Sequence, residues 1–133
     1  MHVRGPFEVK MTPQEHSDKT EGSLLGRMAL DKHYRGDLDA VGKGEMLTAG
    51  TTVKGSAVYV AIERVTGTLE SRAGGFALVH HGTMTRGVPN LSIAVVPDSG
   101  TGELVGIRGT MKVDIVDAKH VYEFDYVFDV SPD

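Results

Sequence analysis

The chain has 133 residues, of which 40% are hydrophobic and 24% charged, and this predicts one globular domain over residues 1–133. A formal net charge of −4 without a block of basic residues excludes a nucleic-acid scaffold. The absence of cysteine excludes disulfides, thiolate metal sites and cysteine nucleophiles. No apolar run is long enough to span a membrane, and residues 1–10 lack an apolar signal core, so we expect no membrane association and a cytoplasmic location.

Apolar and polar residues alternate with a period of two along most of the chain, which predicts β-strands. Val3, Phe7 and Val9 mark a first strand, and a polar loop is predicted over residues 12–23. Helical periodicity is confined to about one turn around residues 102–107. The further strands are predicted over 24–34, 37–47, 52–69, 75–85, 91–96, 110–116 and 120–128, with a hairpin loop at 71–74 and a frayed tail at 129–133.

About eight short strands joined by short turns form an antiparallel meander, which either closes on itself or exposes its edges. The 17 glycines lie within and between the apolar stretches, and closed barrels need such kinks to turn their corners. We therefore predict an all-β fold, a closed antiparallel meander barrel of about eight strands with little helix. The interior of such a barrel holds its own side chains or one small ligand.

The alternation also predicts which side chains face the interior. If Leu69 pairs with Phe76 across the 71–74 loop, the odd-numbered residues of the first strand and the even-numbered residues of the second share the inner face. The closing strand turns its aromatic face inward, because that face buries the larger apolar area. The side chains predicted to line the interior and bind a ligand are Tyr59, Glu63, Phe76, Leu78, His80, Met84, Tyr122 and Tyr126.

Glu63 and His80 are the candidate catalytic residues, because a buried carboxylate needs partners or takes a raised pKa. With Tyr59 nearby, they can bind a ligand's polar group or act as an acid–base pair. The alternative, which we favour from sequence, is a structural hydrogen-bond network without a ligand, or a Glu63 at the rim of the barrel that reaches water. Lys32 also lies on the predicted inner face, either as a counter-ion or snorkelling to water, and snorkelling is the favoured interpretation.

No metal site and no cofactor are predicted. The six histidines are scattered, and the neighbours His80 and His81 face opposite sides of a strand. The Gly100-Thr101-Gly102 segment lacks the long helix and the Gly-Lys-Ser/Thr ending of a phosphate loop, so it is interpreted as a turn.

The row Val58, Val60 and Ile62 is predicted to face outward. Exposed apolar rows of this kind usually meet another subunit or a covering segment. We therefore expect a homo-oligomer that joins through this row, with coverage by the 12–23 loop as the alternative.

Several segments resemble a bacterial family of small uncharacterised proteins, and the resemblance extends from Val3 to Phe128. It implies the closed eight-strand barrel of allene-oxide-cyclase-like proteins. The pattern from Gly100 to Gly109 is similar to a segment of plant allene oxide cyclases and dirigent proteins, which hold a reactive intermediate in an apolar barrel cavity. No cyclase catalytic residue matches this chain, so the resemblance implies the fold and not the activity. The resembling segments are Gly36-Asp37-Leu38-Asp39-Ala40, Gly44-Glu45-Met46-Leu47, residues 55–69, His81-Gly82-Thr83-Met84 and residues 96–104.

Three functions follow as hypotheses. The first is a barrel that binds a small apolar molecule. The second is an isomerase or cyclase in which Glu63 or His80 moves a proton. The third is a structural homo-oligomer whose barrel is filled by its own side chains. A solid interior excludes the first two; Glu63 at the rim favours binding, and Glu63 buried beside His80 favours catalysis.

Overall fold

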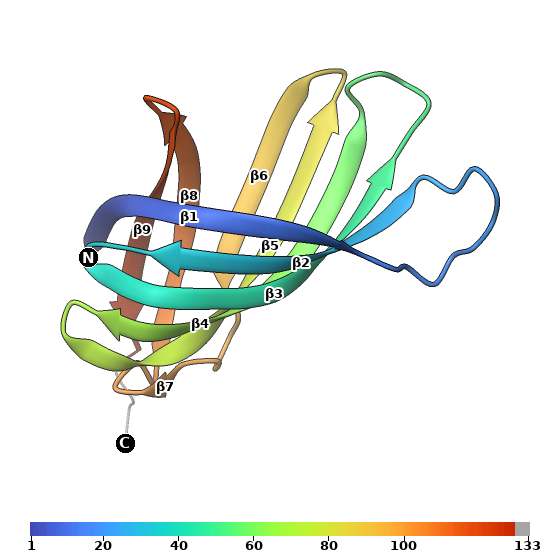
Figure 1. The fold of residues 1–133 in the computed structure, drawn as a ribbon. Helices are drawn as coiled ribbons and strands as arrows, with labels where there is room; N and C mark the ends of the chain where they lie inside the picture. Colours follow the sequence, from blue (N-terminus) through green and yellow to red (C-terminus); the bar gives the residue numbers. More distant parts are fainter. Residues whose placement is uncertain (130–133) are drawn as a thin grey trace.

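The structure is a computed structural model that describes residues 1–129, and Figure 1 shows that these residues form a single all-β barrel. No helix occurs among the described residues, and the predicted helical turn is a non-helical turn over residues 103–106. No described segment is a helix that is long and apolar enough to cross a membrane. The strands are β1 (His2–Gln14), β2 (Leu25–Tyr34), β3 (Leu38–Gly50), β4 (Ala57–Leu69), β5 (Arg72–Thr85), β6 (Val88–Val95), β7 (Thr101–Gly102), β8 (Ile107–Val116) and β9 (Lys119–Phe128).

Eight antiparallel strands form the barrel in the order β4-β3-β2-β1-β9-β8-β6-β5, and the pairing of β4 with β5 closes it. The short strand β7 lies outside this ring and pairs with Gly74 and Gly75 of β5. The predicted closed antiparallel barrel of about eight strands is thus confirmed.

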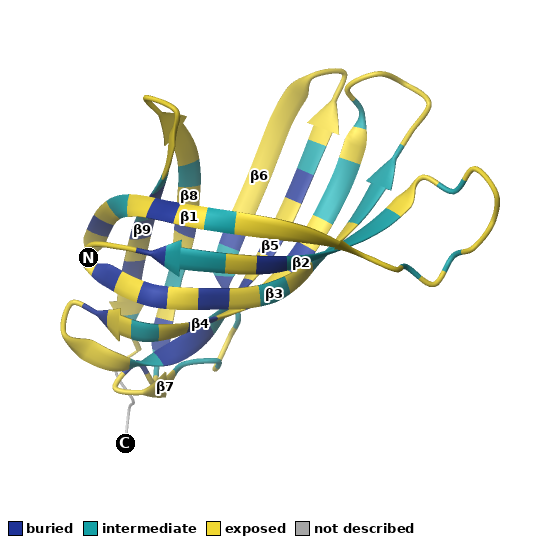
Figure 2. Ribbon diagram, in the orientation of Figure 1, coloured by how far each residue is buried: buried dark blue, intermediate teal, exposed yellow. Residues whose placement is uncertain are grey.

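The barrel is closed at one end and open at the other. β1 pairs with β9 only along His2 to Phe7, and β6 pairs with β8 only at Ile93 and Ala94. Beyond these pairs the β5–β6 and β8–β9 hairpins diverge, as Figure 1 shows. In Figure 2 the buried positions concentrate at the closed end, whereas the upper part of β6 is exposed.

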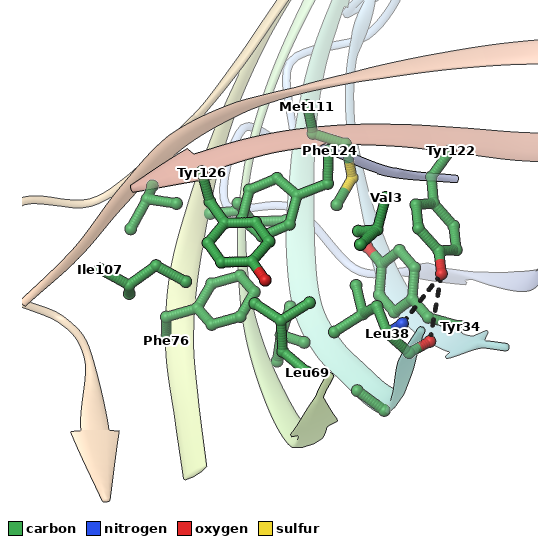
Figure 3. Packing of buried hydrophobic residues seen from close by; sticks show 14 of the residues in the cluster. Val3, Tyr34, Leu38, Leu69, Phe76, Ile107, Met111, Tyr122, Phe124 and Tyr126 are labelled. Carbon is green, nitrogen blue, oxygen red and sulfur yellow. Dashed lines mark hydrogen bonds between the residues drawn. The ribbon is translucent and has the colours of Figure 1, made fainter. Parts of the chain in front are cut away.

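Aromatic side chains fill the closed end. Phe124 stacks between Phe76 and Tyr126, with ring centroids 5.5 and 5.4 Å away. The Tyr122 hydroxyl accepts a hydrogen bond from the Leu38 amide at 3.1 Å (Figure 3). The predicted inward face of the closing strand is confirmed. However, Phe76, Leu78, Tyr122 and Tyr126 belong to this packed core and do not line the cavity at the open end of the barrel.

The predicted loop at 71–74 is wrong, because β4 and β5 are joined by a two-residue turn. Glu70 and Ser71 have φ values of 46° and 72°, as a type I′ hairpin turn requires, and the ladder therefore continues to the turn. Leu69 pairs with Arg72 instead of Phe76, a shift of four positions (76 minus 72). An even shift leaves every side chain on its predicted face.

Other strand boundaries also differ from the prediction: β3 ends at Gly50 and not at 47, β6 begins at Val88 and not at 91, and β8 begins at Ile107 and not at 110. β1 continues to Gln14, so residues 12–14 are strand and the loop follows them; Pro13 is tolerated because β1 has no β9 neighbour there. β4 begins only at Ala57, since the Thr51 hydroxyl donates to the Ser56 carbonyl at 2.8 Å and holds residues 51–56 in a loop.

The predicted tail falls mostly outside the described residues, which end at position 129. Asp129 itself is held in place, because its amide donates to the Gly106 carbonyl at 2.9 Å and its carboxylate pairs with Arg108.

Candidate functional site

Two glycines make room for a carboxylate inside the barrel. Gly42 and Gly44 occupy inward positions of β3, and Gly44 pairs with Glu63 of β4. A Cβ at Gly42 would lie 2.2 Å from Glu63 Oε2, and one at Gly44 would lie 2.1 Å from the Ile62 carbonyl oxygen. Any side chain at these positions would therefore displace the Glu63 carboxylate or the strand beside it.

Glu63 is buried and receives three hydrogen bonds, and we call Lys32, Tyr34, Glu63 and His80 the polar cluster. Lys32 Nζ lies 3.0 Å and His80 Nε2 lies 2.7 Å from Glu63 Oε1. The Tyr34 hydroxyl donates to Glu63 Oε2 at 2.7 Å. The contact between Glu63 and His80 agrees with the sequence analysis, but the preference for a snorkelling Lys32 is wrong. The side chain of Lys32 is only 9% exposed because it is the counter-ion of Glu63.

Tyr34 is a partner of Glu63 that was not predicted from the sequence. The signal was present, since Tyr34 and Lys32 share one face of β2 and Gly42 on β3 leaves space beside them. The contact among the four residues could not be predicted, because it depends on the register of the strands.

The polar cluster holds Glu63 as a carboxylate. Burial raises the pKa of its carboxyl, but the hydrogen bond from His80, the Lys32 ammonium and the Tyr34 hydroxyl outweigh burial and bring the pKa below the ordinary 4.5. A carboxylate only accepts hydrogen bonds, so His80 donates its Nε2–H. Burial and the nearby Glu63 charge raise the pKa of Tyr34, which stays protonated. Lys32 Nζ also lies 5.5 Å from the Phe7 ring centroid, a cation–π contact.

An open cavity of about 680 Å³ occupies the open end of the barrel, between the inner faces of β3–β6 and the 51–56 loop. Of the predicted ligand-lining residues, Tyr59 and Met84 line it, and Met84 is 43% exposed at the mouth. Glu63 and His80 do not line it, because they lie deeper in the barrel than Tyr59 and its partner Gly82. Inward side chains on the cavity wall include Met46, Thr48, Ala57, Tyr59, Met84 and Leu91.

Tyr59 forms part of the wall of this cavity. Its ring lies directly over Gly82, where a Cβ would come within 2.3 Å of Tyr59 Cε1. Its hydroxyl makes no hydrogen bond within residues 1–129 and is not among the buried polar atoms that lack a partner, so solvent in the cavity reaches it. Partial burial raises its pKa. The expected network that joins Tyr59 to Glu63 is therefore absent from the described residues.

Methionines concentrate on the inner face of the barrel. Of the six in the chain, Met46 and Met84 line the cavity and Met28 pairs directly with Met46. Met11 shares the same inner face, since its partner on β2 is the buried Leu30. The flexible, polarisable thioether lets such a surface adapt to ligands of different shape.

The outward row is arranged as predicted. Ile62 is 62% and Val60 43% exposed, whereas Val58 is half-buried. His16 and Asp18 of the loop after β1 border a cavity of about 450 Å³ together with Val58 and Val60. Contact with a second subunit and coverage by the loop both stay predictions. Within residues 1–129, no three His, Asp or Glu side chains are grouped to hold a metal ion.

Comparison with known proteins finds one family and a solved relative. The sequence profile of the family described as "Protein of unknown function (DUF3224)" matches residues 3–126. A crystal structure of a protein with unknown function from the same family, from Shewanella oneidensis MR-1, is 50% identical in sequence and superposes with a TM-score of 0.94. The alignment covers 98% of each chain. No curated protein matches the sequence.

Proposed function

The chain belongs to the DUF3224 family of proteins of unknown function, and we propose that it binds a small apolar molecule in the open end of its barrel. The observation that supports this most is the open cavity of about 680 Å³, whose wall is mainly apolar. Ligand sites of proteins are typically concave, apolar and a few hundred to about 1,000 Å³ in volume, with a small number of polar groups.

The division of the barrel into two halves supports the same function. The closed end is filled by aromatic side chains and supplies stability. The open end exposes Met11, Met84 and Leu91 on inward-facing positions, where a protein without a ligand gains nothing from them. A wholly structural barrel, the third hypothesis, has no use for this cavity.

Acid–base catalysis by Glu63 and His80 is the second candidate, and their burial side by side favours it. Binding is the better supported function, because both Glu63 oxygens already accept hydrogen bonds and neither residue lines the cavity. The likeness to allene-oxide-cyclase-like barrels belongs to this second candidate as analogy only.

A fluorescence titration with N-phenyl-1-naphthylamine, whose emission rises in apolar surroundings, tests the proposal. Ala57→Phe fills part of the cavity, and Thr66→Phe places the same ring on the outer face of the same strand. We expect A57F to weaken binding by about tenfold, which corresponds to about 1.4 kcal/mol, and T66F to leave it unchanged. Absence of binding to the unmodified chain, or equal binding by A57F, contradicts a site at the open end.

A further inference from the structure

We propose that the ligand is an uncharged, mainly apolar molecule that carries one hydrogen-bonding oxygen, and that Tyr59 selects it by pairing with that oxygen. This inference rests on the proposed function and specifies the ligand class of the same site. It follows from where the barrel places charge and where it leaves a polar group without a partner.

The charges of Lys32 and Glu63 inside the barrel are already paired. Lys32 and Glu63 are both buried and lie 3.0 Å apart, so each compensates the other. Both oxygens of the Glu63 carboxylate already accept hydrogen bonds, Oε1 from Lys32 and His80 and Oε2 from Tyr34. The charges of Lys32 and Glu63 therefore cancel. A charged ligand group placed beside the polar cluster would lose its hydration without gaining a counter-ion.

Within residues 1–129, the cavity wall above the polar cluster offers no buried charge. The inward-facing positions of β3–β6 on this wall are methionine, leucine, alanine, glycine, proline and threonine, apart from Tyr59. Lys54 is the cationic side chain on the wall, and it is exposed at the mouth, where water screens it. An anionic ligand thus finds no buried cation in the cavity.

Tyr59 places a phenol hydroxyl group on this wall. Its ring lies over Gly82, where any side chain larger than glycine would displace it. Its hydroxyl makes no hydrogen bond within the described residues and is reached by solvent in the cavity, since it is not among the buried polar atoms that lack a partner. Partial burial raises its pKa, so it stays protonated and both donates and accepts. A ligand that covers this hydroxyl without a hydrogen bond leaves it buried and unpaired, which costs free energy, and a ligand hydroxyl or carbonyl oxygen avoids that cost.

A pair of probes with the same aromatic framework tests the charge requirement. N-phenyl-1-naphthylamine is neutral, and 8-anilinonaphthalene-1-sulfonate adds one negative charge. We expect the neutral probe to bind and the sulfonate to bind at least about tenfold more weakly, with little change in Lys54→Gln. Failure of both probes to bind overturns the proposed function itself. Equal or tighter binding of the sulfonate, lost in K54Q, overturns only the present inference.

Displacement of the neutral probe tests the role of Tyr59. We expect 1-decanol to displace it at lower concentration than decanoate or decane. Tyr59→Phe keeps the ring over Gly82, so it should weaken decanol by about three- to tenfold, the effect of one hydrogen bond, and leave decane unchanged. An equal loss for decanol and decane indicates a packing role for Tyr59, and no loss for either shows that its hydroxyl does not contact the ligand; both results overturn the assignment.

Discussion

Removal of the Glu63 charge should destabilise the barrel strongly, because it leaves the Lys32 ammonium without its counter-ion. In Glu63→Gln the side-chain shape is kept, but the amide cannot accept from Lys32, His80 and Tyr34 together. Removing one partner of a buried ion pair costs about 3–5 kcal/mol. We expect the lower value, about 3 kcal/mol, because the amide oxygen still accepts one of the three hydrogen bonds. At about 3–5 °C per kcal/mol for a chain of this size, Tm should fall by about 10–15 °C.

Urea denaturation of four proteins measures this effect: the unmodified chain, E63Q, Lys32→Met and the double variant. The double variant should lose less than the sum of the single losses by at least about 1 kcal/mol, because K32M removes the unpaired ammonium. Glu45→Gln is the matched control, since Glu45 pairs with Arg27 on the exposed outer face and should cost below about 1 kcal/mol. A loss below about 1 kcal/mol in E63Q, or strict additivity with K32M, refutes the ion-pair account.

Three further predictions concern the polar cluster and the outer face. Gly42→Ala should cost about 1–3 kcal/mol in urea denaturation because its Cβ meets Glu63 Oε2, and that cost should shrink in an E63A background; an undiminished cost locates the clash elsewhere. The Glu63 carboxyl has a lower pKa in the folded chain than in the unfolded chain, so the unfolded chain takes up this proton first as the pH falls. The contribution of Glu63 to stability is complete above pH 4.5 and is lost as the pH falls through the pKa of the folded state. Between pH 5 and 3 the unmodified chain should therefore lose more stability than E63Q, and parallel pH profiles contradict this. We expect the purified chain to be a homo-oligomer, and Ile62→Glu should reduce its mass in light scattering; a monomer without the substitution excludes the outer-row interface.

The sequence predicted the barrel and its inner face because both depend on the period-two alternation. Tyr59, Glu63 and His80 were placed on one face even though the predicted register was four positions off, since an even shift does not exchange the faces. Alternation alone does not say how far a strand lies from the closed end. Phe76 and Met84 share one face of β5, yet one packs the core and the other lies at the mouth.

The partners of Glu63 were harder to predict because they come from strands remote in sequence. Lys32 and Tyr34 precede Glu63 by about 30 residues and reach it across β3, where Gly42 leaves the space empty. The prediction that Lys32 snorkels was wrong because it considered hydration of the ammonium group and did not consider an ion pair with Glu63. The open end is set by the positions at which β6 stops pairing with β8 and β9 stops pairing with β1. No local sequence pattern marks those positions.

The most direct test of a ligand site at the open end is an NMR titration of the chain labelled with ¹³C at its methionine methyl groups. N-phenyl-1-naphthylamine should shift the resonances of Met46 and Met84, which line the cavity, and leave that of Met1 unchanged as the internal control. Binding of the probe without any shift at Met46 and Met84 would place its site elsewhere on the molecule and contradict the account.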